Sequence, residues 1–257
     1  LSLINDLSSL LQLHKFVDDC TLTEIISRLS SSLMQQEINK VNDWSELNFM
    51  NINTSKTKEM LLGSIKTKHT PTLLLNGQAI DRVSSYKLLG LHVTDTLRWN
   101  DHVSSICTKA AQRLHFLKQL KHAGMSAADL LYFYQTVIRP VAEYACVVWH
   151  SSLTKGQTNE LESIQRRAIK IIFSYNSDDM VDALNSLPSL SERRDQLSKH
   201  FFTNLLTPSS CLHHIIPEKR SDDITSRLRN AKQYYTSLAR SERYKNSPIT
   251  YAFNHYF

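Results

Sequence analysis

Apolar and polar residues follow two different periods along the chain, and the period changes near the hundredth residue. Before that point, short apolar runs are separated by turn residues, and the strongest hairpin signal is Asn76-Gly77 between two such runs. Short strands are also expected on either side of Asp18-Asp19, and another from Tyr86 to Val93. The first part of the chain therefore predicts strands joined by tight turns.

One helix is expected among these strands. Thr21 and Glu24 have the spacing of a capping box, which marks the start of a helix. The pattern then predicts an amphipathic helix that ends at about Asp43, because apolar residues recur at near-helical intervals at Ile25, Leu29, Leu33, Ile38 and Val41. Trp44 is expected to close this helix onto the sheet.

The second part of the chain predicts helices. An apolar stripe begins after Asn100, the expected N-cap, and stops before Gly124; its members are Val103, Ile106, Ala110, Leu114, Leu117 and Leu120. A second helix opens with the capping residue Ser126, and Pro140 should kink or break it. A third is expected over 161–172.

Shorter helices are expected over 179–187 and 191–206, with mostly extended or irregular chain after them. The predicted fold class is α+β, with a partial β-sheet and a helix at the N-terminus followed by a mainly α-helical region. The pattern predicts three parts: residues 1–98, a helical domain over 99–206, and a basic, irregular segment over 207–257.

Composition agrees with a globular protein, since 41% of the residues are hydrophobic and 21% are charged. The net charge of +6 and a pI near 9.1 favour a nucleic-acid partner through attraction to phosphates. No apolar run approaches the roughly 20 residues that span a bilayer, and no secretory signal is evident, so no membrane partner is expected. The four cysteines lie far apart, which is typical of reduced thiols inside a cell, in the nucleus or the cytoplasm.

The run Lys15-Phe16-Val17-Asp18-Asp19 carries the most specific chemistry. Phosphoryl transfer by polymerases uses two divalent metals about 3.5–4 Å apart, which converging carboxylates hold. A double aspartate at a tight turn can place one carboxylate on a metal and the next beside it. Aspartate pairs are also ordinary turn and helix-start residues, and this chain has two more, at 178–179 and 222–223.

Other segments surround that pair in an order that resembles the reverse transcriptases of non-LTR (LINE-type) retrotransposons. They are Ile4-Asn5-Asp6-Leu7, Trp44, Asn53-Thr54-Ser55-Lys56-Thr57-Lys58 and Tyr86-Lys87-Leu88-Leu89-Gly90. The stretch from Ile138-Arg139-Pro140 through Tyr144 and Trp149 to Gln165-Arg166-Arg167-Ala168 resembles the helical thumb, and Arg243-Tyr244-Lys245-Asn246-Ser247 a segment near the end of such frames. The resemblance implies the end of a palm with its primer grip, then a thumb-like domain.

The resemblance also implies roles for single residues. Asp18 and Asp19 would hold Mg2+ (or Mn2+) in the complete enzyme, and Lys56 would assist the departure of pyrophosphate. Gly90 would let the primer approach the backbone. A surface loop at Lys56 and a strand bulge at Gly90 are the alternatives. An RNA template and a DNA primer would be the partners, and this chain alone would be inactive because the first catalytic aspartate and the fingers would precede Leu1.

Basic residues of the helical region are expected to contact nucleic acid, with a solvated charged face as the alternative. Lys109, Arg113 and Lys121 share or border one helix face, and Arg166, Arg167 and Lys170 cluster on another. Between residues 219 and 245 there are eight Lys or Arg against three acids, with tyrosines interleaved; Arg243 and Lys245 belong to this set.

Two other interpretations of the whole chain stay open. In one, the chain is a non-catalytic nucleic-acid-binding or interaction module, in which Asp18-Asp19 is an ordinary turn. In the other, it is a decayed transposon copy that does not fold stably, because unpaired strand edges leave backbone groups and apolar surface without cover.

Overall fold

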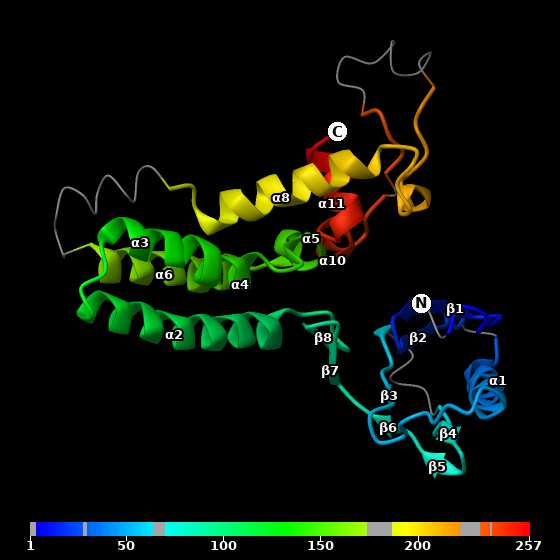
Figure 1. The fold of residues 1–257 in the computed structure, drawn as a ribbon. Coiled ribbons are helices and arrows are strands. Elements are labelled where there is room, and N and C mark those ends of the chain that lie inside the picture. Colours follow the sequence, from blue (N-terminus) through cyan, green and yellow to red (C-terminus); the bar gives the residue numbers. More distant parts are fainter. Residues whose placement is uncertain (1–3, 28–29, 64–69, 174–186, 222–231, 237) are drawn as a thin grey trace. The chain divides into compact units, whose positions relative to one another are not determined.

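The computed structural model describes residues 4–27, 30–63, 70–173, 187–221, 232–236 and 238–257. Its contacts divide the chain into two compact units, 1–97 and 98–257, which are considered one at a time (Figure 1). Among the residues described above, the first unit contains short strands and one α-helix, and the second unit is mainly helical. The predicted α+β class is confirmed at this coarse level.

A two-stranded hairpin opens the first unit, as the sequence predicts. Strands β1 (Gln12–Phe16) and β2 (Asp19–Thr23) pair antiparallel, with Phe16 opposite Asp19. Val17 and Asp18 form the turn, and Val17 has φ +57°, a left-handed conformation that β-branched residues rarely adopt. Both residues are exposed, so the turn of this hairpin faces solvent.

Helix α1 (Met34–Leu47) begins later than the sequence predicts. Residues 24–27 and 30–33 are not helical, so the predicted capping box at Thr21 and Glu24 is wrong. Glu24 instead accepts hydrogen bonds from Ser32 Oγ at 2.6 Å and from the Leu33 amide at 2.8 Å, directly before the helix. Three successive serines, 30–32, favour this arrangement because serine competes with helical backbone bonding.

A buried carboxylate joins α1 to the chain that precedes β1. Glu37 is 1% exposed and accepts hydrogen bonds from Ser9 Oγ at 2.7 Å, the Leu10 amide at 2.9 Å and Lys40 Nζ at 2.5 Å. The bond from Lys40, and after it the bond from Ser9, lowers the pKa of Glu37 to about 2, although burial opposes the shift. The charged form of Glu37 is therefore part of the folded first unit.

The remaining strands of the first unit form three small pairs. β3 (Lys58–Glu59) lies parallel to β6 (Asp81–Arg82), and β4 (Leu74–Leu75) pairs with β5 (Gln78–Ala79) across the predicted Asn76-Gly77 turn. The single strand predicted from Tyr86 to Val93 is wrong. The chain there reverses at Leu89 and Gly90, which both have positive φ, so it forms the hairpin of β7 (Ser85–Leu88) and β8 (Leu91–Thr94).

Two parallel helices form the base of the second unit. A hydrogen bond of 2.7 Å from Gln157 Nε2 to Asn100 Oδ1 joins the start of α6 (Lys155–Ile172) to the start of α2 (Asn100–His122). At the other end of both helices, Lys121 Nζ donates to the carbonyl of Ile172 at 3.1 Å. Asn100 is thus not the predicted N-cap; Trp99 has that position, and the Asn100 side chain bonds the neighbouring helix.

The sequence predicts that Pro140 kinks or breaks its helix, and the helix is indeed irregular just before this residue. Helix α3 (Ala127–Phe133) starts at Ser126, whose side chain accepts a bond from the Asp129 amide. It continues into a π-helical turn, η2 (Tyr134–Ile138), and then into α4 (Arg139–Glu143), which carries the proline near its start. The missing proline N–H and the wider π turn leave carbonyls without their usual partners. Arg113 of α2 donates to a carbonyl of this π turn, that of Val137.

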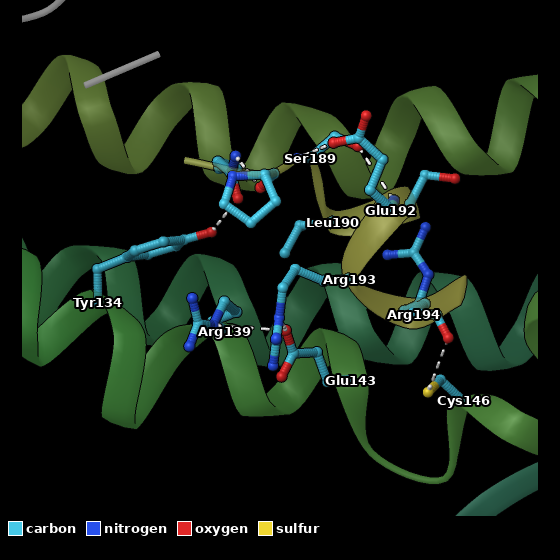
Figure 2. A network of polar contacts seen from close by, with 12 residues as sticks. Tyr134, Arg139, Glu143, Cys146, Ser189, Leu190, Glu192, Arg193 and Arg194 are labelled. Carbon is cyan, nitrogen blue, oxygen red and sulfur yellow. Dashed lines mark hydrogen bonds and ion pairs between the residues drawn. The ribbon is translucent and has the colours of Figure 1, made fainter. Parts of the chain in front are cut away.

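A polar network holds α8 (Leu190–Leu205) against α4 and α5 (Cys146–Trp149), as Figure 2 shows. The carboxylate of Glu143 lies 3.4 Å from Arg139 Nε and 3.2 Å from Arg193 Nε. Deeper in this unit, the hydroxyl of Tyr134 donates to Gln165 at 2.7 Å. Helix α8 agrees with the helix predicted over 191–206, whereas the helix predicted over 179–187 falls almost wholly outside the described residues.

The end of the chain differs from the irregular segment that the sequence predicts. It contains α10 (Glu242–Lys245) and α11 (Pro248–His255) after a short turn η4 (His213–Ile215). Ala252 and Phe253 of α11 are fully buried against Phe202 and Leu205 of α8. Burial of this apolar face stabilises α11, although the residues before it show no helical period.

The role of Glu37 predicts how the first unit responds to acid. Because the folded state lowers the pKa of Glu37 from 4.5 to about 2, its contribution to stability is complete above about pH 5 and is lost as the pH falls through that interval. The unfolding temperature of the first unit should therefore fall between pH 5 and pH 2, and Glu37→Gln should remove part of that dependence. Glu46→Gln, an exposed acid on the same helix, should retain it; equal pH profiles for both variants would contradict the assignment.

Candidate nucleic-acid interface

One side of α2 presents only groups that suit nucleic acid. Every exposed residue from position 109 to the end of the helix is a cation, an amide, a histidine or a phenylalanine, and these define the α2 face: Lys109, Gln112, His115, Phe116, Lys118, Gln119 and His122. The buried stripe of Ile106, Ala110, Leu114 and Leu117 fixes this orientation, because it turns the opposite side of the helix toward the core. The helix has no acid after Asp101.

The second half of α6 adds further positive charge. Arg166, Arg167 and Lys170 are exposed there, and no acid follows Glu162 within the helix. Because α2 and α6 run parallel, their basic halves lie at the same end of the pair (Figure 1). Arg167 lies on the α2 side of α6, since its charge acts on Cys107: burial and Glu160 raise the pKa of that thiol and Arg167 lowers it. The two basic surfaces are therefore neighbours.

Arg113 and Lys121, which the sequence predicts to bind nucleic acid, instead bond backbone carbonyls of other helical elements. Arg113 donates to the carbonyl of Val137, and Lys121 donates to the carbonyl of Ile172. Both side chains are half-buried, unlike Lys109 and Lys118. These bonds give Arg113 and Lys121 a structural role, which the spacing of charges along the sequence did not reveal.

Sequence reasoning missed Lys118. It lies three residues after His115 and four before His122, so the three side chains share one side of the helix. The signal was present in the sequence, since the apolar stripe already assigns the opposite side of α2 to the core. It was missed because the prediction weighed charged residues one by one rather than the whole exposed side.

The residues of the first unit that were predicted to form a polymerase site lie at three different turns on its surface. Asp18 lies in the turn of the β1–β2 hairpin and Asp19 begins β2, and both are exposed. Lys56 is exposed in a turn where its amide bonds Asn53, and Gly90 lies in the β7–β8 turn at φ +87°. Within the described ranges, no group of three or more His, Cys, Asp or Glu is placed to hold a metal ion. Metal binding by Asp18 and Asp19 and a chemical role for Lys56 stay predictions.

The basic candidates near the C-terminus lie elsewhere in the second unit. Arg243 and Lys245 are exposed on α10, and Lys245 Nζ lies 3.5 Å from Glu242. The carbonyl of Asn246, just after this helix, accepts bonds from the hydroxyls of Ser151 and Ser152 in η3 (His150–Ser152). Figure 1 shows α10 beside α5, away from the C-terminal end of α2. The structure thus does not bring this pair to the α2 face.

A hollow of about 430 Å³ lies where η3, α8 and α11 meet, lined by His150, Ser151, Ser191, Glu192, Asp195, Gln196 and Tyr251. Beneath it, the buried guanidinium of Arg194 lies 5.5 Å from the Trp149 ring centroid, and Arg194 Nε lies 3.4 Å from His150 Nδ1. Burial, followed by the charge of Arg194, lowers the pKa of His150 to about 4, against the effect of Asp195. The imidazole is therefore neutral near pH 7.

This hollow does not assemble a nucleophile and its base. The hydroxyl of Ser151 donates to the Asn246 carbonyl at 2.7 Å, and Asp195 accepts a bond of 2.6 Å from the Tyr256 hydroxyl. A base that activates a nucleophile must lie within hydrogen-bond reach of it and be held by a third group. The contacts of His150, Arg194 and Asp195 instead hold α8 to α11 and η3.

Comparison with known proteins gives one match. Residues 99–139 match the family described as Alkylated DNA repair protein alkB homolog 8, N-terminal. The matched stretch contains α2, α3 and η2, and so includes the whole α2 face. No curated protein and no solved structure matches the chain.

This match corrects the interpretation of the chain as a non-LTR retrotransposon fragment. The family that matches is not a reverse transcriptase, so assignment of the parent protein as an RNA-directed DNA polymerase of a transposable element is wrong. The resemblance rested on short segments in a given order, and each segment has an ordinary structural use. Asn53, for example, accepts the bonds that form the turn at Lys56, and the Leu89-Gly90 pair forms the turn of a hairpin. In the part of the chain that is described, no helix is both long and apolar enough to cross a membrane.

The contrast between internal and exposed cations of α2 can be measured. Arg113→Met removes the donor to the Val137 carbonyl and should lower the free energy of unfolding by about 1–3 kcal/mol. Lys109→Met, the same kind of change on the exposed side, should alter it by less than about 0.5 kcal/mol. Urea unfolding of both variants tests the difference, and equal losses would show that Arg113 has no structural role.

Proposed function

We propose that this chain is a non-catalytic nucleic-acid-binding module, and that it contacts phosphates through the α2 face together with Arg166, Arg167 and Lys170 of α6. The observation that carries the proposal is the exposed basic surface of the second halves of the two parallel helices, in which neither helix has an acid. Lysine and arginine that neutralise phosphates release condensed counterions, which drives binding without regard to sequence.

The comparison supports the same conclusion. The family that matches residues 99–139 bears the name of a DNA repair protein, and the matched residues include the α2 face. The amides of Gln112 and Gln119 add donors and acceptors beside the cations, as surfaces that contact phosphates, sugars and bases commonly do. Strands of RNA and of DNA both present the phosphates that this surface requires, and we propose either as a partner.

Salt dependence provides the test of this interface. Combined Ala substitution of Arg166, Arg167 and Lys170 should weaken binding and reduce the slope of log K against log salt by about 0.7–0.9 for each phosphate that the variant no longer neutralises. The matched control replaces three exposed cations elsewhere, Lys155, Lys199 and Arg240, and removes the same charge. Fluorescence anisotropy between about 50 and 200 mM salt, a range over which such affinities fall steeply, measures both slopes. An unchanged slope in the first variant, or equal changes in both, would reject the interface.

A non-catalytic module also predicts indifference to magnesium. At constant ionic strength, affinity for an oligonucleotide should not fall when EDTA replaces Mg2+, and Asp18→Ala should have no effect, because phosphate contacts of this kind come from Lys and Arg. Titration of the wild type and the variant with and without Mg2+ checks this. A loss of binding in EDTA that Asp18→Ala reproduces would restore a metal-binding role to the β1–β2 hairpin.

A further inference from the structure

Phe116 is an exposed aromatic residue in the middle of the α2 face. Its side chain is 59% exposed, whereas Leu114 and Leu117 on the same helix are almost fully buried. The residues three and four positions away, which flank it on a helix surface, are Gln112, Arg113, Gln119 and the half-buried Leu120. The ring therefore lies among polar and basic groups, outside the core.

A second ring lies beside it. The centroids of His115 and Phe116 are 6.1 Å apart, with an interplanar angle of 67°. Both side chains are exposed, and the exposed Lys109 lies two helical turns before Phe116 on the same side of α2. Aromatic rings combined with cations along one surface are the features by which proteins bind single-stranded nucleic acid, since the rings stack on bases and the cations attract the backbone.

We propose that Phe116 stacks on an unpaired base, so that the α2 face takes single-stranded segments in preference to continuous duplex. This inference rests on the proposed function and names its substrate class. In a duplex, neighbouring base pairs cover both faces of each base, so an aromatic side chain gains no stacking contact unless the duplex is unstacked, which costs a few kcal/mol. In a single strand the face of the base is open, and Lys109, seven residues before Phe116 and therefore on the same side of α2, can contact the neighbouring phosphates.

A docking site for another protein would have a different surface. Such sites are marked by contiguous apolar patches, whereas the exposed residues that flank Phe116 on α2 are the amides Gln112 and Gln119. A base, which has an apolar face and polar edges, fits a ring flanked by Gln112 and Gln119 better than an apolar side chain does.

The test compares Phe116→Ala with the wild-type chain on a single-stranded oligonucleotide and on a duplex of the same sequence. Loss of one stacked base should weaken single-strand binding by about 5- to 150-fold. Duplex binding should change less than about twofold. The control is Tyr132→Ala, which removes an aromatic side chain of similar exposure, 69%, from α3 and should leave both affinities unchanged. RNA and DNA strands are both tested, and equal unfolding midpoints verify that the variants fold.

Phe116→Trp gives a direct reading of the contact. This variant should keep the affinity for single strands, and its fluorescence should be quenched by single strands but not by duplex. Suppose that the wild type binds single strands with the expected salt dependence. If Phe116→Ala then binds single strands as tightly as the wild type, or loses the same affinity for single strands and for duplex, the stacking inference is wrong and the proposed function stands. If the wild type binds neither ligand, both are wrong.

Discussion

The parallel contact between α2 and α6 determines where the second unit carries its positive charge. Two hydrogen bonds fix this contact, Gln157 to Asn100 at the first turns and Lys121 to the Ile172 carbonyl at the last. If the helices ran antiparallel, the basic half of one would lie beside the start of the other, near Asp101 or Glu160. In the parallel arrangement both basic halves meet at one end, and the acids of both helices lie toward the other.

The cations of this end serve two purposes, and packing determines which. Arg113 faces η2 and donates to the carbonyl of Val137, so its guanidinium is used inside the protein. Lys109 lies four residues earlier but is exposed. Packing therefore separates Arg113, whose side chain is used inside the protein, from Lys109, whose side chain is exposed.

Turn and capping residues in the sequence correctly predicted the elements that depend only on residues close together in the chain. The turn at Asn76-Gly77 and the capped start of α3 at Ser126 were predicted correctly, because each follows from the conformational preferences of a few residues. The late start of α1 and the helix α11 were missed, because Glu24 and Phe202 stabilise them from a distance in the sequence. Of the candidate interface, the sequence predicted Lys109 and the α6 cations but neither Lys118 nor Phe116, since charges were weighed one by one rather than as part of the whole exposed side of α2.

Identification of the residues that touch bound nucleic acid tests the central claim most directly. Ultraviolet crosslinking of the full chain to a single-stranded oligonucleotide, followed by mass spectrometry of the crosslinked peptides, reports those residues without any substitution. The account predicts crosslinks within 109–122 and 166–170. Crosslinks confined to the β1–β2 hairpin or to α10 and α11 would contradict it.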